Sequence, residues 1–116
     1  MKAKKTRDEK KPRDEVLAFI KHFEGARETF LRGCCYWFAH ILSERFWLRE
    51  NVAILYEPVE GHFITQIGER YYDVRGDVTD LYRGFRLYTL DAMRREGSAM
   101  YRHLMRDCRD FIDPKD

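Results

Sequence analysis

The chain has 116 residues, of which 44% are hydrophobic and 36% charged, which suits one soluble domain and is too little for two cores. Its 22 basic and 20 acidic residues leave a formal net charge of +2, so there is little reason to expect nucleic acid as the main partner. No segment approaches the ~20 apolar residues of a membrane span, and no apolar run follows the first positive charges, so we expect neither a membrane helix nor a secretory signal.

The first thirteen residues, MKAKKTRDEKKPR, are almost wholly polar and mostly basic. We interpret residues 1–13 as a disordered tail, because Asp8 and Glu9 interrupt the positive run and chain termini fray in water. A basic arm that touches RNA or DNA is the alternative. The rest of the chain, residues 14–116, is then a single domain.

Two helices are predicted before any strand. Asp14 can cap a helix that runs to about residue 23, where Gly25 stops it. A second helix is predicted from about Gly33 to residue 48, and it is apolar nearly all round, as a central buried helix would be. We interpret the aromatic residues of this segment as core: Tyr36, Trp37, Phe38, Phe46 and Trp47.

An alternating pattern of apolar residues follows the two helices and predicts an antiparallel meander. The expected strands cover residues 52–56, 63–67 and 71–74. After Gly76 a short turn is expected over residues 79–82, and residues 85–88 could form a strand or the first turn of a helix. The last predicted element is a helix from about residue 98, with an apolar stripe that reaches Ile112.

This order of elements predicts an α+β fold, in which N-terminal helices pack on a small antiparallel sheet and a helix closes the chain. Residues 52–56 are expected to form an unpaired outer strand, and such an edge could support a dimer.

Cys35 lies where the second helix is expected to begin. A thiol is a nucleophile only as the thiolate, and a helix N-terminus favours the thiolate through its dipole and unpaired amides. Gly33 would allow a sharp turn there, with a free amide aimed at a developing oxyanion. His62, at the end of a strand, can take the thiol proton, and Asp73, one strand further on, can orient the imidazole.

Simpler interpretations stand beside this triad. The chain has three cysteines, an odd number, and Cys34 and Cys35 are adjacent in sequence. We therefore expect no disulfide framework, and a reducing cytoplasm is the simplest location. Cys34 and Cys108 are interpreted as small buried hydrophobes, and Asp77 is a second carboxylate close to Asp73. Adjacent cysteines on a helix point about 100° apart and lack C-x2-C geometry, which disfavours a zinc site made of Cys34, Cys35, His40 and His62. We therefore predict no metal and no cofactor.

The stretch Gly33-Cys34-Cys35-Tyr36-Trp37-Phe38-Ala39-His40 reads as G-x-C-x-x-F-A-H and resembles the nucleophile segment of transglutaminase-like proteins. The later pairs His62-Phe63 and Tyr72-Asp73 are similar to that family's histidine and aspartate strands. The resemblance covers roughly residues 30–80 and implies a papain-like fold. It also implies that Cys35 is the nucleophile, His62 the base and Asp73 the orienting acid, while His40 only packs.

The chain departs from that family in two ways. The interval between Cys35 and His62 is short for the family, and no glutamine precedes Cys35 as a second oxyanion donor, because the only glutamine is Gln66. The function that the resemblance implies is a small cysteine-dependent hydrolase or acyl transferase that acts on amide bonds of a protein or peptide. The alternatives are an inactive binding module of the same fold, for example one encoded by a mobile element, and a protein that contacts nucleic acid through its basic tail.

Overall fold

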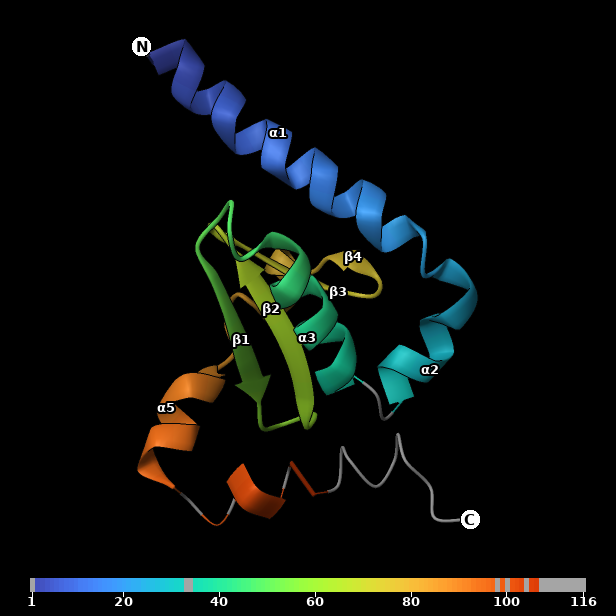
Figure 1. Ribbon diagram of the computed structural model, residues 1–116, viewed down its shortest axis with the longest axis vertical. Coiled ribbons are helices and arrows are strands. Elements are labelled where there is room, and N and C mark those ends of the chain that lie inside the picture. Colours follow the sequence, from blue (N-terminus) through green and yellow to red (C-terminus); the bar gives the residue numbers. More distant parts are fainter. Residues whose placement is uncertain (1, 33–34, 98, 100, 104, 107–116) are drawn as a thin grey trace.

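The computed structural model describes residues 2–32, 35–97, 99, 101–103 and 105–106 (Figure 1). The helical elements are α1 (Lys2–Lys21), the 3-10 turn η1 (Glu24–Ala26), α2 (Arg27–Arg32), α3 (Cys35–Phe46), α4 (Thr79–Tyr82) and α5 (Leu90–Glu96). The strands are β1 (Val52–Glu57), β2 (His62–Ile67), β3 (Arg70–Asp73), β4 (Gly76–Asp77) and β5 (Tyr88–Thr89). Helices precede and follow a run of strands, so the predicted α+β fold is confirmed.

The strands form one sheet in the order β4-β3-β2-β1-β5, and every neighbouring pair is antiparallel. β1 and β2 pair along their whole length, from Val52 opposite Ile67 to Glu57 opposite His62. The expectation of an unpaired outer strand at residues 52–56 is wrong, because Leu55 and Tyr56 pair with β5 on the side away from β2. The edge that was to support a dimer is therefore covered over these residues.

α3 packs on one face of the sheet and supplies much of the core. The Thr65 hydroxyl of β2 donates a hydrogen bond to the carbonyl of Ala39, 3.2 Å away, which fixes the helix on the strand. α1 crosses above α3 and the sheet in the view of Figure 1. The buried residues that join α1, α3 and the sheet are Val16, Ile20, Phe38, Leu42, Phe46, Ile67, Tyr72 and Val74.

The opposite face of the sheet carries a smaller cluster around α4. Alternation along β1 and β2 points Leu55 and Ile64 away from α3, and they pack with Val78 and Tyr82. Tyr82 is only 1% exposed, and its ring packs against His62, the first residue of β2. This short helix thus brings a polar side chain close to the predicted site.

The N-terminal helix is longer than predicted. α1 begins at Lys2 and not at Asp14, because the segment before Asp14 is rich in lysine and arginine, which favour helix. Figure 1 shows its first turns extending beyond the sheet. The division into a tail of residues 1–13 and a domain of residues 14–116 stays a prediction. None of the helices in the described ranges is long and apolar enough to cross a membrane.

Several short elements were not predicted or differ from prediction. α2 lies where the sequence suggested only a connection, and residues 88–96 form β5 and α5 where the pattern was ambiguous. Of the predicted last helix, residues 101–103 and 105–106 are helical, and the rest of residues 98–112 lies outside the described residues apart from residue 99. Phe38 and Phe46 are buried as expected, but Trp47 is 57% exposed because it follows the last turn of α3.

Candidate active site

The three residues of the predicted triad lie at the ends of three different elements. Cys35 is the first residue of α3, His62 the first of β2 and Asp73 the last of β3. All three are buried, with exposed fractions of 9%, 6% and 4% respectively. The packing of α3 on the sheet and the pairing of β2 with β3 bring them together, although 38 positions of the chain separate Cys35 from Asp73.

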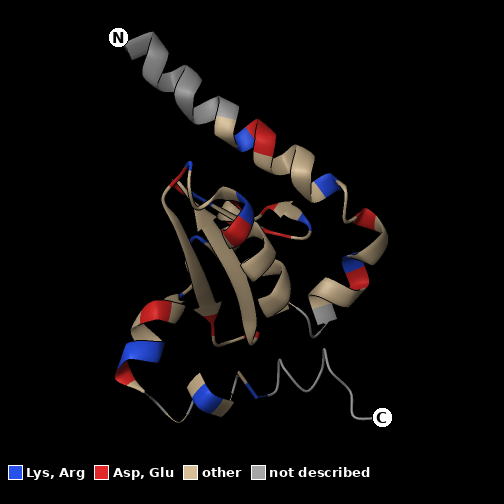
Figure 2. Cartoon of the chain, in the orientation of Figure 1, with Lys and Arg blue, Asp and Glu red and all other residues tan. Residues whose placement is uncertain are grey.

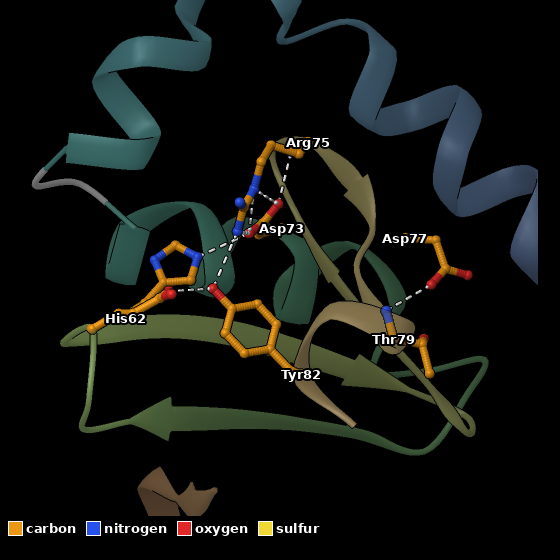
Figure 3. Close-up of polar contacts among 7 residues, drawn as sticks. His62, Asp73, Arg75, Asp77, Thr79 and Tyr82 are labelled. Atoms are coloured by element: carbon orange, nitrogen blue, oxygen red, sulfur yellow. Dashed lines mark hydrogen bonds and ion pairs between the residues drawn. The ribbon is translucent and has the colours of Figure 1, made fainter. Parts of the chain in front are cut away.

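His62 and Asp73 form a buried hydrogen bond. The Nε2 atom of His62 lies 2.9 Å from Oδ2 of Asp73 (Figure 3). Thr65 pairs with Tyr72, so extending that register places Asp73 beside Ile64, two positions from His62. The sequence predicted Asp73 one strand further on than His62, and this contact between neighbouring strands agrees with it.

The thiol of Cys35 lies within hydrogen-bonding reach of His62 and of the backbone N–H groups of Phe63 and Tyr36, because all three groups act on its pKa. His62 is bonded to Asp73 through Nε2. His62 therefore interacts with both Cys35 and Asp73.

The charges of the three groups support one another. Burial raises the pKa of the Cys35 thiol, but hydrogen bonds from His62 and the two amides, with the imidazolium charge, outweigh burial and lower that pKa. Burial lowers the pKa of His62, yet hydrogen bonds to Asp73 and Cys35 and their charges raise it to about 9. The pKa of Asp73 stays below its usual range, since bonds from His62 and Arg75 overcome the effect of burial. This arrangement therefore favours a thiolate beside an imidazolium over a neutral thiol beside a neutral imidazole.

Two further residues hold Asp73 and His62, and the sequence did not single them out. The Arg75 guanidinium donates to both carboxylate oxygens of Asp73, with Nη2 only 2.5 Å from Oδ2, and the Arg75 amide donates to Oδ1 at 2.8 Å. The Tyr82 ring stacks on His62 with centroids 6.0 Å apart. Its hydroxyl accepts from Arg75 at 3.2 Å and donates to Glu60 at 2.8 Å.

A signal for one of these two residues was present in the sequence. Arg75 follows Asp73 by two positions across a turn, a spacing at which a side chain folds back on its neighbour. Tyr82 lies seven positions beyond Arg75, and only the path of the β4–α4 connection brings it against the imidazole. No spacing rule would have found it.

Other candidates lie away from the site or outside the described residues. Asp77 accepts hydrogen bonds from Arg13 and Arg70, at 2.9 and 2.7 Å, and so is not the orienting acid. The Gln66 side chain donates to the carbonyl of Gly68, so it is not an oxyanion donor. His40 stacks on Tyr36. Among the described residues no group of three histidine, cysteine or acidic side chains could hold a metal ion. Gly33, Cys34 and Cys108 lie outside the described residues.

Comparison with known proteins gives one match. A family model described as Phage YunG-like protein matches residues 16–105, which include the whole sheet, α3 and all three triad positions. No curated protein and no solved structure matches the chain.

Proposed function

This chain belongs to the Phage YunG-like protein family, and we propose that it is a small thiol enzyme that cleaves or transfers the acyl group of an amide or peptide bond. The observation that carries the proposal is the continuous, buried chain from the Cys35 thiol through His62 to Asp73, with a His62–Asp73 distance of 2.9 Å. The order of these residues along the chain, and the elements that carry them, support the resemblance to transglutaminase-like and papain-like enzymes.

In the proposed reaction His62 first donates a proton and later accepts one, and Cys35 first bonds to the acyl group and later releases it. The Cys35 thiolate attacks the carbonyl carbon, and the C–N bond breaks as the His62 imidazolium gives its proton to the leaving amine. A thioester remains on Cys35. Water, or an acceptor amine in a transfer, then attacks the thioester while neutral His62 takes its proton, and the C–S bond breaks to restore the thiolate and the imidazolium.

The oxyanion of both tetrahedral intermediates needs donors. The amide of Cys35 lies at the N-terminus of α3, where a helix leaves its first N–H groups without intrahelical partners, and it can serve this role. Asp73 remains ionised throughout and stabilises the imidazolium rather than accepting its proton. Since the reaction requires a reduced thiol, we place the protein in the cytoplasm.

The cheapest test is alkylation of Cys35 across pH. A variant with Cys34→Ser and Cys108→Ser leaves a single thiol, and its rate of reaction with iodoacetamide should stay high well below the ordinary thiol pKa of ~8.5. In the same background His62→Ala should move the midpoint of that rate towards ~8.5. An ordinary thiol titration that His62→Ala does not change would overturn the proposal. A screen of peptides for cleavage or deamidation then identifies the substrate.

One observation favours a second candidate, a catalytically inactive binding module of the same fold. Cys35 is only 9% exposed and packs with Met93 of α5, so access to the sulfur is narrow. In that case the low thiol pKa would survive as a remnant, but no peptide or amide in the screen would be turned over by the wild-type protein. Turnover that Cys35→Ala abolishes decides for the enzyme.

A further inference from the structure

A cavity of about 540 Å³ opens beside the first turn of α3. Its walls come from two segments that are distant in sequence, the start of α3 and the helical residues that follow α5. The lining side chains are Tyr36, Trp37, Tyr101, Arg102, Met105 and Arg106. This volume lies in the range of small-molecule and peptide side-chain pockets.

The cavity lies next to the buried cluster that contains Cys35. Cys35 belongs to a buried cluster with Ala39, Tyr56, Phe63 and Met93. Three residues that line the cavity pack directly against this cluster: Tyr36, Tyr101 and Met105. Tyr36 also follows Cys35 in the chain, and its amide donates to the sulfur. A group seated in the cavity would therefore lie close to the cluster that contains Cys35.

The lining combines two kinds of chemistry. Aromatic rings and the Met105 thioether offer apolar contact, while Arg102 and Arg106 are exposed guanidinium groups at the rim. Arg102 uses one N–H to hold the carbonyl of Gly97 at 2.8 Å, which fixes its position and leaves other donors of its fork for a ligand. Among the described residues, no acidic side chain lines the cavity. Figure 2 shows both basic and acidic residues on α5, and basic residues on the helical residues after it.

We propose that this cavity is the recognition pocket of the thiol enzyme and that its substrate is an acidic peptide. An aromatic or aliphatic side chain of the peptide fills the cavity, and a neighbouring carboxylate binds Arg102 and Arg106. Arginine suits this role because its planar fork matches a carboxylate. The inference rests on the proposed function, because it takes Cys35 as the group that attacks the bound peptide.

The test compares two alkylating reagents of similar size in the variant that keeps only Cys35. Iodoacetate carries the carboxylate and iodoacetamide does not, so the ratio of their rates reports the positive charge near the sulfur. Arg102→Gln with Arg106→Gln should lower this ratio about three- to tenfold, and 1 M salt should shrink the effect. Arg95→Gln is the matched control, since Arg95 is an exposed arginine of α5 that does not line the cavity.

A second measurement tests the peptide itself. The capped tetrapeptide Tyr-Glu-Tyr-Glu should protect Cys35 from iodoacetamide at lower concentration than its neutral counterpart Tyr-Gln-Tyr-Gln, and the double arginine variant should lose this difference. Equal protection by the two peptides, or an unchanged reagent ratio in the double variant, would overturn the inference. Failure of the proposed function looks different: iodoacetamide alone would then show an ordinary thiol titration that does not depend on His62.

Discussion

At the scale of single residues, the site is a balance between burial and pairing. Burial alone would keep Cys35 and His62 neutral, and the structure offsets it with a hydrogen bond between them and with the carboxylate of Asp73. The charged form of each group is therefore stabilised by its neighbours. Asp73 depends in turn on Arg75, which keeps the carboxylate ionised and fixes both of its oxygens.

The first prediction concerns the titration of His62. Its pKa is about 9 in the intact site, and Cys35→Ala should lower that pKa because the thiolate and its hydrogen bond are lost. The value should remain above the ordinary 6.5, since Asp73 still accepts from Nε2. Nitrogen NMR of the imidazole across pH measures both values. An unchanged titration in Cys35→Ala would mean that the two side chains do not interact.

The second prediction concerns Asp73. Asp73→Asn should keep the fold but slow turnover strongly, because the amide favours the wrong imidazole tautomer and cannot stabilise the imidazolium; the matching change in a serine-protease triad costs about 10⁴-fold. Circular dichroism checks the fold, and kcat/KM on the peptide found by screening gives the loss. The single variants Cys35→Ala and His62→Ala and their double variant should lose similar amounts of activity. Additive losses would indicate a structural cluster and not one catalytic unit.

At the scale of elements, the turn between β3 and β4 positions a carboxylate, Asp77, that connects several elements. Gly76 adopts a φ of 117°, which L side chains rarely adopt, so the turn can bring Asp77 back beside β3. Asp77 then binds Arg13 of α1 and Arg70 of β3, and its Oδ1 accepts the Thr79 amide at 3.0 Å at the start of α4. One carboxylate thus joins three elements around the acid of the triad.

The third prediction follows from this role of Asp77. Asp77→Asn should lower the free energy of unfolding at pH 7 by about 1–2 kcal/mol, a value reduced because both arginines are about 40% exposed. The folded-state pKa of Asp77 lies below its usual range, so its stabilisation is complete above about pH 4 and is lost as pH falls further. Urea unfolding of both proteins at pH 7 and in acid measures this. The pH dependence of Cys35 alkylation should stay as in the wild type.

The elements that the sequence predicted correctly are those in which a periodic pattern of apolar residues extends over a long segment. α3 and β1 to β3 are amphipathic or buried over several residues, so hydrophobic spacing located them within about two positions. β4 and β5 have two residues each, and their existence depends on pairing with a neighbour that no local pattern reveals. The proximity of Cys35, His62 and Asp73 was predictable because each lies at one end of a periodic segment. Tyr82 was not, since α4 is a single turn placed by the tertiary fold.

At the scale of the whole molecule, the site exists only when α3 and the sheet are assembled. Cys35 comes from the helical half of the chain, whereas His62 and Asp73 come from the hairpin that follows it. The core cluster that joins α1, α3 and the sheet contains no triad residue, yet it fixes the distance between the helix and β2. The low pKa of the thiol is therefore a property of the folded domain rather than of the Cys35 segment.

The last prediction tests that dependence. In urea, the rapid reaction of Cys35 with iodoacetamide at pH 6 should disappear at the same midpoint as the far-ultraviolet circular dichroism, because unfolding separates the thiol from His62. Val16→Ala removes methyl groups from a fully buried side chain of α1 and should lower the free energy of unfolding by about 1–3 kcal/mol. Both urea midpoints should therefore fall together. Removing residues 2–11, the polar start of α1, is the control and should shift neither midpoint. Fast alkylation that persists in the unfolded chain would place the origin of the low pKa in the local sequence and not in the assembled site.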